Sequence, residues 1–528
     1  MNYQLHEISR KSLKKGKNGI LKIIFGRTGI LLICLLLQCL LLFVGLQILA
    51  QYVHWFFGGY LIFGFLIFTL IINRTDNPGF QLSWTALVLL LPVFGGLLYL
   101  YVEVQPGTKY MKACLKEIDE KTKGSTPQDK KVLEELAAKE GRVAQLAGYI
   151  RKVADYPVYK NTKVTYFPSG EEKFAALVQE LSRAKKYIFL EYFIIAEGYM
   201  WDTVFKILKA KVEEGVEVRV MYDGMNELSN LPHDFPNLLR GSGIQCKVFS
   251  PIYPVISTHY NNRDHRKVVV VDGVTAFTGG VNLADEYINR KERLGHWKDA
   301  GIMLQGDAAA SFTAMFLKMW GTSGTLDNLS VYLREGEKRK GDFSKAEGFI
   351  MPYATSPFGS ERIAERVYIE ILNGAKQYVH IMTPYLVPGY ELLQALLYAS
   401  RRGVDVKLLL PHIPDKKYAF ALAHTYYAQL IEAGIRIYEY TPGFVHSKVF
   451  VSDDRIAVVG AINLDYRSLY LNYECAVMLY EVEEIQKIED DFAMTLPKCR
   501  LITPFDIRHD RFLRVAAGKL LRIVAPLM

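Results

Sequence analysis

The chain contains one short pattern twice, as HRKVVVVD at residues 265–272 and as HSKVFVSD at residues 446–453. Both copies read H-x-K-x4-D, and every shared position recurs 181 residues later. The register continues through two further pairs, Gly279 with Gly460 and Asn282 with Asn463. A single H-x-K pattern is common, but two copies with shared downstream positions indicate an internal duplication.

The segments before each copy predict the same alternation of strands and helices. Each half is expected to contain a strand, a helix and a strand, at 186–195, 201–214 and 216–223 in the first and at 377–386, 391–402 and 403–410 in the second. The start of the second strand also repeats, as GVEVR at 215–219 and GVDVK at 403–407. These repeats predict an α/β fold made of two homologous halves, and a first-half insertion near 252–263 is a candidate substrate-facing loop.

The repeated residue types suit chemistry on a phosphodiester. Alternation along a strand puts the His and Lys of each copy on one face, so packing the halves together would gather two imidazoles and two ammonium groups in one pocket. One histidine, His265 or His446, can attack phosphorus while the other protonates the leaving alkoxide, and symmetry leaves open which one attacks. The candidate phosphate-binding side chains are Lys267, Lys448, Asn282 and Asn463. We expect no metal and no other cofactor, because no His/Asp/Glu cluster has metal-ligand spacing.

Three acidic residues complete the candidate set. Asp272 and Asp453 close the two motifs and are included with the catalytic residues, although fixing the turn after each strand is an alternative role. Glu191 lies on the first predicted strand, either as a supporting partner of the site or as a satisfied acid at the end of the sheet.

Composition limits the classes of protein to be considered. The chain has 528 residues, of which 50% are hydrophobic and 23% charged, so we expect two or more folded domains. The net charge is +9, but residues 1–28 carry +6 of it, which favours a membrane surface over a basic nucleic-acid groove. Six scattered cysteines indicate neither a disulfide framework nor a zinc site.

An apolar region follows the basic tail. Three runs, at 29–50, 55–72 and 82–101, are each long enough as a helix to span a bilayer, with two spans as the alternative. The basic tail predicts a cytoplasmic N-terminus, and three spans would place the remainder of the chain across the membrane. Lys109, Lys112 and Lys116 favour cytoplasmic retention of that remainder instead, so the side of the catalytic domain stays open. The predicted localisation is a multi-pass protein of the cell membrane.

The expected domains follow from these features. They are a basic tail at 1–28, a transmembrane region at 29–103, a charged helical connector at 104–160, a first half at 161–345 and a second half at 346–528. The second half ends in a basic, apolar stretch at 508–521, which suits either an interfacial amphipathic helix or an ordinary surface helix.

At these residues the chain resembles the phospholipase D superfamily, whose signature is the doubled His-Lys-Asp motif, and within it the bacterial cardiolipin synthases. The likeness to the synthases covers nearly the whole chain, including Asn77-Pro78, the FPSG stretch at 167–170, Glu191-Tyr192, Thr383-Pro384-Tyr385 and the C-terminal Ala525-Pro526-Leu527. One departure from internal symmetry is Gly280 in the first half against Ala461 in the second.

The resemblance implies a fold and a reaction. It implies two α/β sandwich halves that form one bilobal catalytic unit, and transfer of a phosphatidyl group between two phosphatidylglycerol molecules to give cardiolipin and glycerol. By motif position His265 is similar to the nucleophile and His446 to the general acid, with a phosphatidyl-histidine intermediate and no metal. Asp299 and Glu474 match the acids that orient the two histidines. The implied partners are phosphatidylglycerol, other anionic phospholipids and the membrane.

Three alternative functions remain open from the sequence. A phospholipase D-type lipid hydrolase would share every catalytic residue. A nuclease of the same superfamily would need a basic single-strand groove, which the small charge beyond the tail argues against. A non-enzymatic membrane scaffold would keep the doubled motif only as a relic. The oligomeric state and the acyl preference are not predicted.

Overall fold

The computed structural model describes residues 27–47, 53–74, 77–232, 234–251, 261–339, 341–359 and 361–527. It divides into two compact units, an N-terminal unit up to Tyr110 and a larger unit that holds most of the chain from Met111 onward, including both repeated motifs. Most of the basic tail (1–26) and most of the predicted insertion (252–260) lie outside the described residues.

Apolar helices form the described part of the N-terminal unit. They are α2 (Arg27–Gln47), α3 (Val53–Ile72), α4 (Pro78–Leu90) and α5 (Pro92–Val104). Gln38 is buried on α2, where its amide donates to Tyr60 Oη at 3.0 Å and accepts from Phe94 N at 2.8 Å. One polar side chain therefore ties α2 to both α3 and α5.

The third predicted apolar run, 82–101, is not one helix. It is divided between α4 and α5, each of 13 residues, with the break at Leu91 and Pro92. Proline has no N–H to donate within a helix and is tolerated in the first turn, so Pro92 ends one helix and begins the next. In the described part of the chain, no helix combines the length and the apolar character needed to cross a membrane.

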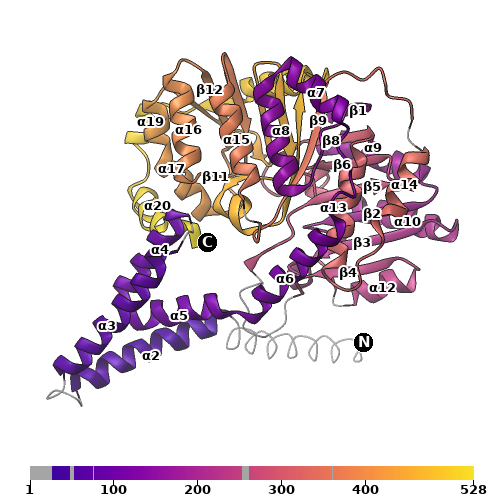
Figure 1. The fold of residues 1–528 in the computed structure, drawn as a ribbon. Helices are drawn as coiled ribbons and strands as arrows, with labels where there is room; N and C mark the ends of the chain where they lie inside the picture. The colour runs from indigo at the N-terminus through magenta and orange to yellow at the C-terminus, as the bar shows by residue number, and fades with distance from the viewer. Residues whose placement is uncertain are drawn as a thin grey trace, which may run out of the picture. The chain divides into compact units, whose positions relative to one another are not determined.

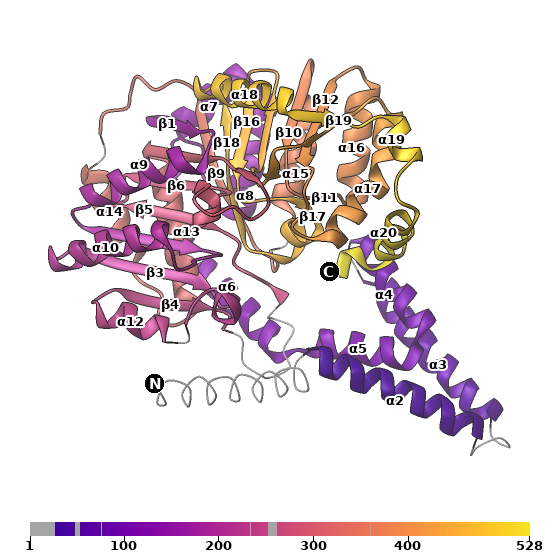
Figure 2. The same ribbon diagram turned by 180° about the vertical axis from the view of Figure 1, so that it is seen from behind.

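The larger unit begins within the first of three successive helices and continues with the two halves, which lie side by side in both views (Figures 1 and 2). The three helices are α6 (Pro106–Thr122), α7 (Lys130–Lys139) and α8 (Gly141–Ala154). They occupy the segment expected to be a charged helical connector.

The first half is built on a seven-stranded sheet with the order β1-β8-β6-β5-β2-β3-β4. Its strands are β1 (Thr162–Phe167), β2 (Tyr187–Tyr192), β3 (Glu217–Asp223), β4 (Gln245–Phe249), β5 (Lys267–Val271), β6 (Thr275–Gly279) and β8 (Gly301–Gly306). Its helices are α9 (Gly170–Arg183), α10 (Tyr199–Glu213), α11 (Asn226–Ser229), α12 (Phe235–Gly241), α13 (Ala309–Gly321) and α14 (Leu329–Arg339).

The second half repeats this sheet with one strand added at the edge, in the order β9-β18-β16-β15-β10-β12-β13-β19. Its strands are β9 (Phe349–Thr355), β10 (Tyr378–Met382), β12 (Asp405–Pro411), β13 (Arg436–Tyr440), β15 (Val449–Ser452), β16 (Ile456–Gly460), β18 (Glu474–Tyr480) and β19 (Cys499–Leu501). Its helices are α15 (Ile363–Gly374), α16 (Tyr390–Arg401), α17 (Lys417–Glu432), α18 (Glu484–Thr495), α19 (Pro504–Arg508) and α20 (Phe512–Val524). The prediction of two homologous α/β halves is confirmed.

Helices cover both faces of the first sheet. On β2, Ile188 and Leu190 point into the apolar core that α9 and α10 complete. Phe189 points the other way and stacks on Phe316 of α13, with ring centroids 4.6 Å apart. Because successive side chains of a strand alternate between faces, a strand buried on both sides has a nearly continuous apolar sequence, as β2 has apart from Glu191.

Candidate active site

The two motif histidines lie just before equivalent central strands, His265 before β5 and His446 before β15. Each imidazole is paired with an acid of the other half. His265 Nδ1 lies 2.9 Å from Glu474 Oε1, and His446 Nδ1 lies 2.7 Å from Asp299 Oδ2. All four side chains are buried. With Nδ1 held by an acid, Nε2 is the ring nitrogen of each histidine that can meet a substrate.

Backbone hydrogen bonds fix this crossed arrangement. The residue before each acid accepts a hydrogen bond from the backbone N–H of the paired histidine, at 3.0 Å for Tyr473 O and 2.7 Å for Lys298 O. Next to the contact between His446 N–H and Lys298 O, the strands β7 (His296–Lys298) and β14 (Gly443–Val445) form a short parallel ladder. The histidine and the acid of each pair are therefore placed by the main chain as well as by their side chains.

The motif lysines are buried beside the histidines. Lys267 begins β5 and Lys448 precedes β15, and each ammonium donates to the carbonyl oxygen of its own motif histidine. Burial lowers the pKa of Lys267 to about 8 and that of Lys448 to about 7, and the charge of Lys267 adds to the shift at Lys448. Two desolvated cations that repel each other favour binding of an anion between them.

Burial also lowers the pKa of both histidines, well below the usual range for His265 and to about 4 for His446. The motif lysines add to the shift, whereas Asp299 opposes it at His446. Both imidazoles are therefore neutral at pH 7 in the free protein. A phosphate bound among these groups would raise both pKa values, since a nearby anion favours the charged imidazolium.

The two orienting acids differ in charge. Burial raises the pKa of Glu474 to about 8 despite the nearby Lys267. Burial would also raise the pKa of Asp299, but His446 and Lys448 outweigh it and the pKa is lowered. At pH 7 Asp299 is a carboxylate, whereas Glu474 is mostly protonated. His446 is thus the better placed of the two histidines to carry a positive charge.

Gly280 makes room for the shorter acid. A Cβ atom at this position would lie 2.0 Å from Asp299 Oδ1, which no side chain can tolerate. The equivalent residue of the second half is Ala461, which follows β16. The acid on the neighbouring strand β18 is the longer Glu474. The sequence difference between the halves therefore follows the difference between their acids.

The two motif asparagines do not have equal roles. Asn282 accepts from Ile194 N at 3.0 Å and donates to Tyr287 Oη at 2.8 Å, so both ends of its amide are engaged. The Tyr287 ring meets His446 edge-on at 5.3 Å, which makes Asn282 a positioning residue. Asn463 Nδ2 donates to Ser468 Oγ at 3.1 Å, but its buried Oδ1 has no partner in the described part of the chain.

Asp272 and Asp453 lie at the far ends of β5 and β15 from the histidines. Asp272 accepts hydrogen bonds from the backbone N–H groups of residues 185–187, and Asp453 does so from those of residues 376–378. Both adopt the left-handed region, at φ 53° and 54°, which aspartate tolerates better than most residues. These contacts fit the predicted alternative, in which the aspartates fix the turn after each strand, and put them outside the reacting centre.

Glu191 is also outside the histidine pocket. Glu191 on β2 lies opposite Val268 on β5, and residues directly opposite on neighbouring strands point to the same face of the sheet. Lys267 precedes Val268 on β5, so its side chain points to the other face of the sheet. Glu191 instead lies 3.7 Å from Arg266, and burial together with the neighbouring Asp264 raises its pKa well above the usual range.

Several residues near the histidines carried no recognisable sequence signal. Phe193 meets His265 edge-on at 5.0 Å, and Trp297 lies 5.7 Å from His446 between ring centroids. Lys173 on α9 is fully buried over Gly301, and burial lowers its pKa to about 8. These side chains come from a loop, the strand β7 and the helix α9, so only the folded chain brings them to the site.

Comparison with known proteins agrees with this geometry. The family model described as "Cardiolipin synthase, PLD-like domain" matches residues 177–320 and 368–496, which together contain both motifs. The chain belongs to the cardiolipin synthase family of phospholipase D-like enzymes.

Relatives match along most of their length. A cardiolipin synthase of Halalkalibacterium halodurans is 30% identical over 93% of this chain and 99% of that protein. An uncharacterized protein of Streptococcus mutans is 48% identical over 85% of this chain and 96% of that protein. The phosphatidylserine synthase of Haemophilus influenzae has the same fold, with a TM-score of 0.52 and 13% identity over 72% of this chain and all of that chain.

Replacement of the two acids should have unequal effects. We expect Asp299→Asn to lower the turnover of a phosphodiester by about a thousandfold or more, since an amide cannot hold the imidazolium of His446. Glu474→Gln should cost less than about tenfold at pH 6.5, because Glu474 is already mostly protonated below its pKa of about 8. Initial rates of both variants at pH 6.5 test this. Equal losses would contradict the assigned charge states.

Replacement of the motif aspartate should affect stability. Asp272→Ala leaves three backbone N–H groups without their acceptor, and we expect a loss of about 1–3 kcal/mol in the free energy of unfolding. Urea denaturation followed by circular dichroism measures the loss. Asp202→Ala, an exposed aspartate on α10, is the control and should change stability by less than about 0.5 kcal/mol.

Proposed function

We propose that the protein is a phosphatidyltransferase that makes cardiolipin and glycerol from two phosphatidylglycerol molecules through a phosphatidyl-histidine intermediate. The observation that carries the proposal is the pair of crossed histidine–acid contacts flanked by two buried lysines. Cardiolipin synthases at about 30% identity over most of the chain support the choice of substrate class.

In the first step, neutral His265 attacks the donor phosphate through Nε2. An N–P bond forms and the P–O bond to the terminal glycerol breaks. His446, which becomes protonated once the phosphate is bound, gives its Nε2 proton to the leaving glycerol oxygen. The carboxylate of Asp299 supports the imidazolium of His446. The protonated Glu474 accepts from Nδ1–H of His265 through its carbonyl oxygen, which keeps this ring neutral and leaves the lone pair of Nε2 free to attack. Lys267 and Lys448 stabilise the charge that develops on the phosphoryl oxygens.

In the second step, a glycerol hydroxyl of another phosphatidylglycerol attacks the same phosphorus. A P–O bond forms, the N–P bond breaks and His446 takes the proton of the hydroxyl, which restores both histidines. Water in place of the hydroxyl would give phosphatidic acid. Transfer therefore needs an acceptor held against the phosphatidyl-enzyme more effectively than water.

We propose a membrane location for this reaction. Apolar side chains on α3 are more than half exposed, among them Leu61, Phe65 and Leu66. At the other end of the chain, Phe512, Leu513 and Leu520 of α20 are 81%, 80% and 69% exposed beside the exposed basic residues Lys519 and Arg522. An exposed apolar face with adjacent cations suits the surface of an anionic bilayer.

The proposed reaction predicts a defined product. Purified full-length protein in detergent, given labelled phosphatidylglycerol and a chelator, should form cardiolipin and glycerol in equal amounts. Phosphatidic acid as the only lipid product would identify a hydrolase, and no product would favour a scaffold. His265→Ala and His446→Ala should each abolish the transfer, the second because an alkoxide leaves poorly without a proton. Near-normal rates in the second variant would contradict the proposed role of His446.

The proposed interfacial helix predicts a contact with lipid. In full-length protein reconstituted into vesicles, the added fluorescence of Phe512→Trp should be quenched by brominated phosphatidylglycerol. Met494→Trp is the matched control, because Met494 is an exposed apolar residue on α18, where the added fluorescence should not be quenched. Equal quenching, or none, at the two positions would argue against α20 as a membrane contact.

A further inference from the structure

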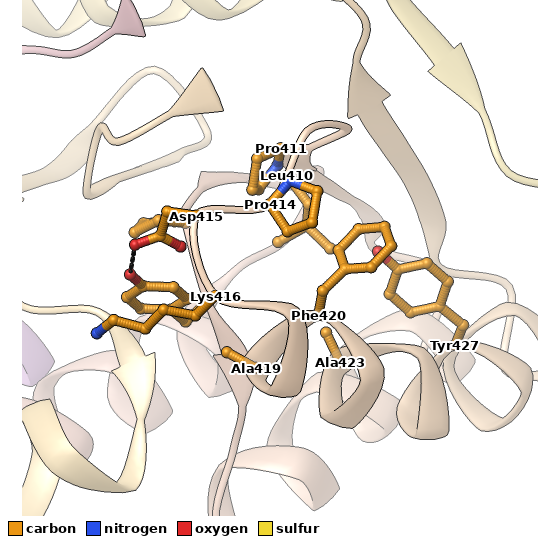
Figure 3. A pocket seen from close by; sticks show the side chains of 11 residues that line it. Leu410, Pro411, Pro414, Asp415, Lys416, Ala419, Phe420, Ala423 and Tyr427 are labelled. Atoms are coloured by element: carbon orange, nitrogen blue, oxygen red, sulfur yellow. Dashed lines mark hydrogen bonds between the residues drawn. The ribbon is translucent and has the colours of Figure 1, made fainter. Parts of the chain in front are cut away.

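A small pocket opens at the carboxyl ends of β10 and β12, outside the set of residues predicted from the motifs. Its lining includes Tyr385, Asp415, Lys416, Phe420 and Tyr427. Figure 3 shows Asp415 and Lys416 on one side and the rings of Phe420 and Tyr427 on the other. The pocket thus has a polar, charged side and an aromatic side.

The polar side is held by two contacts. Tyr385 Oη donates to Asp415 Oδ2 at 2.6 Å, and Lys416 Nζ lies 5.1 Å from the centroid of the Tyr385 ring. The side chain of Lys416 is exposed and forms no ion pair within the described residues, although its charge opposes the raised pKa of the partly buried Asp465. Asp415 is engaged by Tyr385, so the ammonium of Lys416 remains available to an anion that enters from solvent.

The register of the second sheet puts this pocket beside the catalytic groups. Met382, the last residue of β10, pairs with Val449, the residue after Lys448. Tyr385 therefore follows β10 at the edge of the sheet where the motif begins. The charges agree with this placement, because Lys416 contributes to the lowered pKa of His265 and Asp415 opposes the lowered pKa of Lys448.

The described residues at the equivalent place of the first half are arranged differently. Glu191 of β2 and Met382 of β10 occupy equivalent positions, because each pairs with the residue after the motif lysine of its half. Ile194, three residues after Glu191, is therefore the equivalent of Tyr385, three residues after Met382. After β3, Asp223 is paired with Arg263 at 3.3 Å, and both are buried. Within the described residues, the cation at this place of the first half is buried and paired, whereas Lys416 of the second half is exposed and forms no ion pair.

We propose that Lys416, set by the Tyr385–Asp415 pair, binds the phosphate of the acceptor phospholipid. This inference rests on the proposed function. The donor phosphate lies between the motif lysines, and the acceptor brings a second phosphate separated from its reacting hydroxyl by one glycerol unit. Two anionic headgroups repel each other, so a site that joins them needs a further cation for the second phosphate. This cation must lie one glycerol unit away from the reacting hydroxyl. The contact would also hold the acceptor hydroxyl against the phosphatidyl-enzyme in preference to water.

The test compares two soluble acceptors that differ in the phosphate alone. With phosphatidylglycerol as donor, labelled glycerol measures transfer to a neutral alcohol, and labelled methyl glycerophosphate measures transfer to an alcohol with a singly charged phosphodiester. The wild type should prefer methyl glycerophosphate in kcat/KM. Lys416→Ala should lower transfer to methyl glycerophosphate, and cardiolipin formation, by about 10- to 100-fold, the usual effect of losing a charged hydrogen bond. Transfer to glycerol should fall much less.

Two further variants sharpen the comparison. Lys417→Ala removes the adjacent exposed lysine and should leave both transfers unchanged, whereas Lys416→Arg should restore much of the preference. Equal losses for both acceptors in Lys416→Ala would overturn the proposal, as would unchanged transfer to methyl glycerophosphate. Failure of the wild type to transfer to either acceptor would instead contradict the proposed function, so the two failures are distinguishable.

Discussion

The crossed pairing of histidine and acid is the constraint on which the catalytic unit depends. His265 needs Glu474 and His446 needs Asp299, so each half supplies the orienting acid of the other and neither half holds a complete site. A buried acid or imidazole without its partner is costly, because desolvation is then uncompensated. The same pairs therefore join the two halves and prepare the two nitrogens for reaction.

Burial of so many ionisable groups makes the site incomplete without an anion. Lys267 and Lys448 repel each other and have lowered pKa values, and both histidines are held neutral. A bound phosphodiester, as proposed, would supply the missing negative charge, favour the charged form of both lysines and raise the pKa of His446 toward the range of a general acid. Binding of the substrate would therefore also protonate His446 and make it a general acid. If His446 were already an imidazolium in the free protein, this coupling would not be needed.

The 181-residue repeat is sufficient to predict the two α/β halves and the convergence of the two His-x-Lys pairs, because equal spacing puts equal residues at equal positions on homologous strands. Strand alternation also explains the place of Glu191, which faces Arg266 rather than Lys267. The pairing of Asp299 with the histidine of the other half depends on how the sheets meet, so the residues alone do not determine it. Hydropathy alone likewise does not show the helix break at Pro92.

The departures from internal symmetry fit the proposed two-step reaction. At one pH a nucleophilic histidine must be neutral while its partner exchanges a proton, and two identical environments would give the two rings the same charge. The chain separates them through a protonated Glu474 beside Ala461 and an ionised Asp299 beside Gly280. Tyr385 and Lys416 break the symmetry further, and they do so on the half whose histidine is proposed to take the proton of the acceptor. Duplication accounts for the shared fold of the two halves, and divergence at these few positions accounts for the different roles proposed for the two histidines.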